Sequence, residues 1–199
     1  MSARIYIEGG GDSKELHIRC REGFRRLLEK CGFGGRLPRL VACGGRGATL
    51  DDFATAHSNA GADEYVAMLV DSEDPLRDVE RTWDHLHARD GWARPQGAHD
   101  EQVLLMTTCM ETWIASDRQA LRDHYGDCLQ ESALPSLGNV ESRTPKDVQD
   151  ALAHATRTCR AGYAKGKRSF EIVGKLSPAA LRPHLPSFAR CERVLGARL

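Results

Sequence analysis

Acidic side chains stand at the ends of two strand-like segments of this 199-residue chain. Glu8 directly follows residues 4–7, a short β-branched and aromatic run. Asp71 directly follows residues 65–70, which are apolar throughout. Carboxylates that are crowded together repel one another, and a divalent cation relieves that repulsion. Because ligation by oxygen alone suits hard ions, the two positions predict a Mg²⁺ or Mn²⁺ site.

Three further acids extend this pattern. Glu73 follows Asp71 closely, Asp12 follows Glu8, and Glu111 comes after a fourth strand-like segment, residues 102–107. Glu8, Asp71 and Glu73 are expected to hold one ion that activates water against a phosphodiester, with Asp12 and Glu111 holding a second. Two alternatives stay open, because Asp12 can be a helix cap and Glu111 can be a first-turn acid that favours the helix dipole.

A local basic segment, residues 160–170, stands out in a chain that is neutral overall. It contains Lys165 and Lys167, either of which could hold a phosphate or stabilise charge in the transition state. The alternative is a solvated basic surface without a catalytic role.

Three consecutive glycines, residues 9–11, separate the first strand-like run from a helical pattern. Such a loop can cradle a phosphate, or it can simply allow a tight turn. It lacks the Gly-Lys-Ser/Thr ending of a P-loop and the glycine spacing of a dinucleotide fingerprint.

The elements that must position these residues alternate between strand and helix. Strands are expected over residues 4–7, 40–43, 65–70 and 102–107, and helices over residues 14–30, 49–58, 78–89 and 111–125. Thr49 and Asp52 resemble a capping box, and Thr144-Pro145 and Ser177-Pro178 are typical helix starts. This order predicts an α/β fold with an open parallel sheet flanked by helices. Residues 1–128 would form the core, and residues 129–199 a helical extension that completes the same domain.

The composition of the chain disfavours several classes of protein. The 28 Lys and Arg residues balance 28 Asp and Glu residues, which disfavours a generic basic nucleic-acid coat or an acidic tail. No apolar stretch approaches the roughly 20 residues that span a bilayer, and the first residues do not resemble a secretory signal. The seven cysteines lack a Cys-x-x-Cys pair, so we expect reduced, mostly buried thiols in a cytoplasmic protein.

Taken together, the sequence resembles a bacterial family of unknown function with a Toprim-like fold, similar to the nuclease domain of overcoming-lysogenisation-defect type proteins. The resemblance spans nearly the whole chain and is carried by four segments: residues 5–12 (IYIEGGGD), 69–73 (LVDSE), 109–117 (CMETWIASD) and 165–170 (KGKRSF). It implies that Glu8, Asp12, Asp71 and Glu73 match the Mg²⁺-binding acids and that Lys165 or Lys167 matches a late lysine. Glu73 departs from the usual Asp-x-Asp pattern, which shifts the metal geometry.

These observations lead to one main hypothesis and two alternatives. The main one is a Mg²⁺- or Mn²⁺-dependent nuclease acting on DNA or RNA. The resemblance further implies an anti-phage defence role with an ATPase partner. The first alternative is a non-catalytic regulatory or scaffold subunit with a degenerate metal site, and the second is a small-molecule phosphohydrolase or nucleotide-binding module. The sequence does not specify the oligomeric state.

Overall fold

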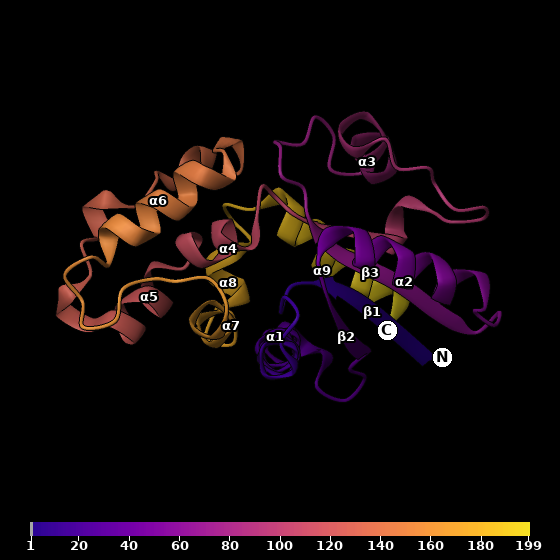
Figure 1. The fold of residues 1–199 in the computed structure, drawn as a ribbon, viewed down its shortest axis with the longest axis horizontal. Helices are drawn as coiled ribbons and strands as arrows, with labels where there is room; N and C mark the ends of the chain where they lie inside the picture. The colour runs from indigo at the N-terminus through magenta and orange to yellow at the C-terminus, as the bar shows by residue number, and fades with distance from the viewer. Residues whose placement is uncertain (1) are drawn as a thin grey trace.

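A four-stranded, all-parallel sheet forms the centre of the protein, with strand order β2-β1-β3-β4. The computed structural model describes residues 2–199. The strands are β1 (Ser2–Glu8), β2 (Arg39–Gly44), β3 (Glu64–Asp71) and β4 (Val103–Met106). The predicted α/β fold with a parallel sheet, flanking helices and a helical C-terminal region is therefore confirmed (Figure 1).

Nine helices and several short helical turns make up most of the remainder of residues 2–199. The helices are α1 (Lys14–Leu28), α2 (Arg46–Ser58), α3 (Thr82–Asp90), α4 (Met110–Ser116), α5 (Arg118–Tyr125), α6 (Pro145–Ala155), α7 (Lys167–Val173), α8 (Pro178–Leu181) and α9 (Pro186–Arg198). The short turns are η1 (Glu29–Phe33), η2 (Asp100–Gln102), η3 (Gly126–Cys128), η4 (Glu131–Ala133) and η5 (Leu137–Ser142).

Alternating side chains of the sheet enter two separate apolar cores. Ile5 and Ile7 of β1 belong to one core, whereas Tyr6 between them belongs to the other. This is the alternation that a strand buried on both faces requires. The first core includes side chains of α1 and α9, and the second includes side chains of α2 and α3. Figure 1 shows α4 to α8 gathered at one side of the sheet, while α9 returns to pack against β4.

The start of α6 agrees with the sequence prediction, whereas the starts of α2 and α3 differ from it. The Thr144 hydroxyl accepts the Asp147 N–H at 3.1 Å, which confirms the predicted start of α6. The predicted start of α2 at Thr49 is wrong, because α2 begins at Arg46 after Gly45 and the Thr49 hydroxyl donates to the Gly45 carbonyl. Helix α3 also begins later than predicted.

The later start of α3 has a remote cause. The Trp83 N–H donates to Asp100 Oδ1 at 2.9 Å, and the Thr82 hydroxyl lies 3.1 Å from the same oxygen. A carboxylate 17 residues further along the chain therefore caps this helix. No local pattern around residues 78–82 could have indicated it.

The predicted helix over residues 111–125 is divided at Asp117. The Asp117 carboxylate accepts the Ala120 N–H at 2.9 Å and the Ser177 N–H at 2.7 Å. The first bond caps α5, and the second ties the break to the start of α8. Because the backbone angles of Asp117 (φ −98°, ψ 88°) are not helical, α4 and α5 are separate helices.

The expectation that every cysteine is reduced is wrong for two of the seven. Cys128 and Cys159 form a disulfide across 31 residues of sequence. Cys20, Cys31, Cys43, Cys109 and Cys191 are free. The spacing of the pair follows no recognisable motif, so only the three-dimensional path of the chain brings the two sulfurs together.

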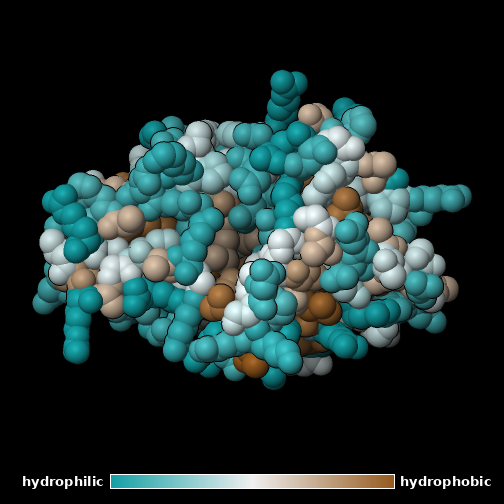
Figure 2. Space-filling model, in the orientation of Figure 1, coloured by the Kyte–Doolittle hydropathy of each residue, from teal (hydrophilic) through white to brown (hydrophobic). Residues whose placement is uncertain are grey.

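The surface is mostly polar. Figure 2 shows one face of the molecule, in the orientation of Figure 1. Hydrophilic side chains cover most of this face, and hydrophobic groups are confined to small separate patches. Among residues 2–199, Ile18 stands out as an exposed large apolar side chain, with 47% of its surface accessible. Within the same residues, no helix combines the length and the apolar character needed to cross a bilayer.

Candidate metal centre

Three carboxylates meet where β1 and β3 end. Glu8 is the last residue of β1 and Asp71 the last residue of β3, and the two strands are parallel neighbours. Glu73 follows two residues after Asp71. Carboxylate oxygens of all three lie within 4.8 Å of one another. We call Glu8, Asp71 and Glu73 the acidic cluster, which lies at the edge where open parallel sheets place their sites.

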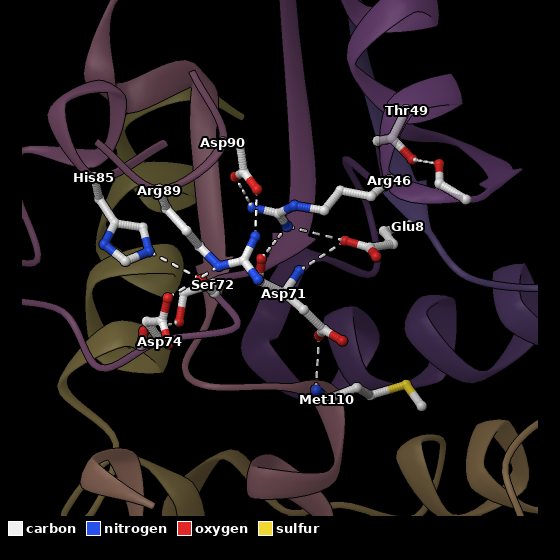
Figure 3. Close-up of polar contacts among 11 residues, drawn as sticks. Glu8, Arg46, Thr49, Asp71, Ser72, Asp74, His85, Arg89, Asp90 and Met110 are labelled. Carbon is white, nitrogen blue, oxygen red and sulfur yellow. Dashed lines mark hydrogen bonds and ion pairs between the residues drawn. The ribbon is translucent and has the colours of Figure 1, made fainter. Parts of the chain in front are cut away.

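Backbone hydrogen bonds fix one oxygen of Glu8 and one of Asp71. The Asp71 N–H donates to Glu8 Oε2 at 3.1 Å, and the Met110 N–H donates to Asp71 Oδ1 at 2.7 Å (Figure 3). The second oxygens, Glu8 Oε1 and Asp71 Oδ2, have no hydrogen-bond donor within residues 2–199. Each side chain is therefore oriented by the protein and still has an oxygen available to a ligand.

Glu73 is held in a conformation that non-glycine residues rarely adopt. Its φ is +65°, in the left-handed region. The Glu73 N–H donates to the Thr108 carbonyl at 2.7 Å, which ties this residue to the segment after β4. Such a conformation costs on the order of 1 kcal/mol and is typical of functional sites.

The acidic cluster is electrostatically unfavourable without a cation. Burial raises the pKa of Glu8 more than the Arg46 charge and the Asp71 N–H lower it. Burial, together with the charges of Glu8, Glu111 and Glu73, raises the pKa of Asp71 well above its usual range. A divalent cation would compensate these charges, and an all-carboxylate donor set fits Mg²⁺ or Mn²⁺.

Arg46 contacts the acidic cluster, and the sequence interpretation did not include it. Its Nη1 lies 3.3 Å from Glu8 Oε2 and also donates to the Asp71 backbone carbonyl. Its Nη2 donates to Asp90 Oδ2 at 2.6 Å, and its guanidinium lies 4.7 Å from the centre of the Trp92 ring. One signal could have identified it, since Arg46 lies two residues after the last residue of β2, at the same edge of the sheet.

The charge of Arg46 also acts on Asp90. Burial alone would raise the pKa of Asp90, but the hydrogen bond and the charge of Arg46 outweigh burial and lower that pKa. Arg89 reinforces this arrangement by pairing with both Asp90 and Asp74. Figure 3 shows the Arg46 guanidinium lying between Asp90 on one side and Glu8 with Asp71 on the other.

A cleft of about 330 Å³ opens beside Glu8 and Asp71. Its lining brings together the ends of the first and third strands, the glycine loop, the start of α4 and the loop before α7: Glu8, Gly9, Gly10, Gly11, Leu16, Gly44, Asp71, Met110, Glu111, Lys165, Gly166, Ser169 and Phe170. Two of the predicted site residues, Glu111 and Lys165, therefore share this cleft with the acids at the ends of β1 and β3.

Glu111 is almost fully buried, with 1% of its surface exposed. Its Oε1 accepts the Tyr163 hydroxyl at 2.9 Å and lies 4.0 Å from Lys165 Nζ. Tyr163 lies in the basic segment, residues 160–170, for which the sequence predicts no separate role of this residue. Burial and the adjacent Glu111 carboxylate raise the pKa of the Tyr163 phenol, so it is a hydrogen-bond donor at neutral pH.

Asp12 and Lys167 lie apart from this arrangement. Asp12 is exposed and belongs neither to the acidic cluster nor to the lining of the cleft. Ser13, not Asp12, caps α1. Lys167 Nζ lies 3.9 Å from Glu15 Oε1, and both side chains are exposed.

The glycine loop pairs with the end of β2. The Gly9 N–H donates to the Gly44 carbonyl at 2.9 Å, and the Gly44 N–H donates to the Gly9 carbonyl at 3.0 Å. A side chain at Gly44 would place its Cβ 2.6 Å from the Gly11 carbonyl oxygen. Gly9, Gly10 and Gly11 all have positive φ, which agrees with the tight-turn interpretation, and they also form part of the cleft lining.

Comparison with known proteins identifies the family of this chain. A search of curated proteins found no match, and a search of solved structures found none either. A family model described as a domain of unknown function (DUF4276) matches residues 7–195, a span that includes Glu8, Asp71, Glu73, Glu111 and Lys165. Because the match extends over nearly the whole chain, this protein belongs to the DUF4276 family.

Proposed function

We propose that this protein is a Mg²⁺- or Mn²⁺-dependent nuclease that hydrolyses phosphodiester bonds of DNA or RNA. The convergence of Glu8, Asp71 and Glu73 within 4.8 Å carries the proposal. Glu8 and Asp71 have raised pKa values, and each has one carboxylate oxygen without a hydrogen-bond donor, as expected of metal ligands in the absence of the cation.

In this proposal the acidic cluster holds the ion, and the cleft receives the substrate. The bound ion would polarise the phosphodiester and lower the pKa of a water molecule. Lys165 would pair with a phosphate oxygen, since its side chain is 62% exposed and it lines the cleft. Tyr163 would keep Glu111 in place, where its charge supports cation binding or a second ion.

Asp12 and Lys167 take no direct part, because both lie outside the cluster and the cleft. The zero net charge implies weak intrinsic affinity for nucleic acid, since that affinity depends on neutralising phosphates. We therefore propose that a partner protein supplies additional binding. An ATPase partner, a defence role and a cytoplasmic location follow only from the resemblance and the composition described above.

One observation favours a second candidate function. Arg46 already pairs with Glu8, so the acids are partly neutralised by the protein itself. A non-catalytic regulatory or scaffold subunit with a degenerate metal site could keep this arrangement without binding a cation.

A cleavage assay separates the two candidates. Plasmid DNA, single-stranded DNA and RNA are incubated with the full chain and Mn²⁺, with and without the product of any ATPase gene that lies beside its own. We expect Glu8→Gln and Asp71→Asn to lower cleavage at least about 100-fold, since each removes a ligand of the ion. Glu15→Gln is the matched control, because Glu15 is an exposed acid outside the cleft. The absence of cleavage under every condition would favour the scaffold.

A further inference from the structure

Arg46 contacts the acidic cluster but is not among the residues that line the cleft. Glu8 and Asp71 both line the cleft, whereas Arg46 does not. Its Nη1 lies 3.3 Å from Glu8 Oε2, and its Nη2 is bound to Asp90. The guanidinium is therefore held between Glu8 and Asp90, outside the lining of the cleft.

The contacts of Arg46 leave it little freedom to bind a phosphate. Nη1 is shared between Glu8 and the Asp71 carbonyl, Nη2 is bound to Asp90, and Trp92 lies against the guanidinium. Arg46 Nε is buried without an acceptor within residues 2–199. The side chain is only 16% exposed. This pattern fits a resident counter-ion rather than a substrate ligand.

A fixed positive charge next to Glu8 opposes a second cation at the same carboxylate. The opposition is weakly screened by salt, because the partners are mostly buried. Asp90 has the contrary effect, since its negative charge partly compensates the charge of Arg46. Arg46 thus competes with a metal ion for Glu8, and Asp90 weakens that competition.

We infer that Arg46 is a positioning residue that acts as the built-in counter-cation of Glu8, and that the Arg46–Asp90 pair sets the affinity of the acidic cluster for divalent cations. The inference rests on the metal site of the proposed function. It means that Arg46 raises the concentration of the ion at which the site is half filled. Between metal-free and metal-bound states, Asp90 and Trp92 keep the guanidinium in place.

Mn²⁺ titrations of the full chain, followed by the electron paramagnetic resonance signal of free Mn²⁺, test this inference without any activity assay. We expect Arg46→Met to bind Mn²⁺ at least tenfold more tightly than the wild type, a gain of about 1.4 kcal/mol. We expect Asp90→Asn to bind it several-fold more weakly, because Arg46 is then less compensated. A merely structural role would weaken binding in both variants.

Arg4→Met is the matched control. Arg4 pairs with Glu64 at the opposite end of β1 and β3, and that pair is also mostly buried. Its loss should change the dissociation constant for Mn²⁺ less than twofold. In Arg46→Met, Asp90 keeps its contact with Arg89, which limits the damage to the fold.

Equal or weaker Mn²⁺ binding by Arg46→Met would overturn the inference. If Arg46→Met does not fold, the test rests on Asp90→Asn. Unchanged or tighter Mn²⁺ binding by Asp90→Asn would then overturn the inference. The proposed function can fail separately, since opposite shifts in the two variants without any cleavage would reject the nuclease and retain the counter-cation. Mn²⁺-dependent cleavage by the wild type, together with an unchanged Mn²⁺ affinity in Arg46→Met, would support the nuclease and reject the counter-cation. No Mn²⁺ binding by either the wild type or Arg46→Met would reject both.

Discussion

Asp71 and Met110 are joined by a hydrogen bond in which the Met110 N–H donates to Asp71 Oδ1 at 2.7 Å. This bond connects the end of β3 to the first residue of α4, 39 residues further along the chain. It orients a carboxylate that burial and three neighbouring acids make costly to ionise. The protein therefore keeps an ionisable group where its own surroundings disfavour the charged form.

Asp71→Asn should make the metal-free protein more stable at pH 7.5. Asparagine can still accept the Met110 N–H, but it removes an incompletely compensated buried charge. We expect the free energy of unfolding in EDTA to rise by about 1–3 kcal/mol. Saturating Mn²⁺ should stabilise the wild type, by about 2.7 kcal/mol at 100 times the dissociation constant, but not this variant. Urea unfolding measures both effects, and a less stable variant in EDTA would contradict the argument.

The stability of the metal-free protein should depend on pH through Glu8 and Asp71. Both groups have a higher pKa in the folded protein than in the unfolded chain. The folded state therefore holds their protons more tightly. The resulting stabilisation is complete below the unfolded pKa, about 4, and is lost as pH rises through the folded pKa values.

The stability difference between the wild type and a Glu8→Gln/Asp71→Asn variant isolates this effect. We expect the variant to be the more stable protein at pH 8 and its advantage to shrink as pH is lowered towards 5. Denaturant unfolding in EDTA across this range is the measurement. A difference that does not change with pH would show that the two carboxyl groups titrate normally.

Glu73→Gly and Glu73→Gln should separate the chemical role of Glu73 from its backbone strain. Both substitutions remove a carboxylate from the acidic cluster, so both should weaken Mn²⁺ binding. Only glycine adopts the φ of +65° without a steric cost. Glu73→Gly should therefore be more stable than Glu73→Gln, by about 1 kcal/mol in urea unfolding. The opposite order would mean that the Glu73 side chain stabilises the turn.

Local patterns in the sequence were sufficient for the sheet and for part of the site. Each strand is a short apolar run, and parallel strands end at one edge, so Glu8 and Asp71 could be placed together without coordinates. Asp90 and Tyr163 could not be identified in this way, and Arg46 could be placed at the same edge but not paired with Asp90. Arg46 meets Asp90 across 44 residues of sequence, and Tyr163 meets Glu111 across 52. Neither separation follows a period of strand or helix.

Contacts between distant residues also explain why the predictions for the helix bounds and for the cysteines were wrong. The cap of α3 is supplied by Asp100, and the break between α4 and α5 is stabilised in part by the Ser177 N–H. The disulfide joins two irregular segments around α6. These features depend on how distant parts of the chain meet, and composition and spacing carry no information about that.

Lys165→Ala and Lys167→Ala form a matched pair for the proposed reaction. Both lysines are exposed to a similar extent, 62% and 63%, so neither loss should affect stability strongly. Lys165 lines the cleft, whereas Lys167 lies near Glu15 outside it. We expect Lys165→Ala to lower kcat/KM for cleavage by about 100-fold and Lys167→Ala by less than threefold. Equal losses would mean that both lysines act through general attraction of the nucleic acid.

The Cys128–Cys159 disulfide should stabilise the helical region that carries Tyr163 and Lys165. It closes a loop across 31 residues, which contains α6. Restricting the unfolded chain in this way is worth about 3–4 kcal/mol by the loop-entropy relation. Hydrogen bonds from Gln130 to Ala155 and from Thr158 to Cys128 join the same two segments. Reduction should therefore loosen this region without unfolding the sheet.

Cys128→Ser/Cys159→Ser tests this expectation by its midpoint of thermal unfolding, with and without a dithiol reductant. We expect the reductant to lower the midpoint of the wild type and to leave that of the variant unchanged. Thiol labelling of the unfolded protein should count five reactive cysteines before reduction, which are the free ones, and seven after it. Seven before reduction would show that the pair does not form. An unchanged midpoint on reduction would show that Gln130 and Thr158 hold the two segments together without the disulfide.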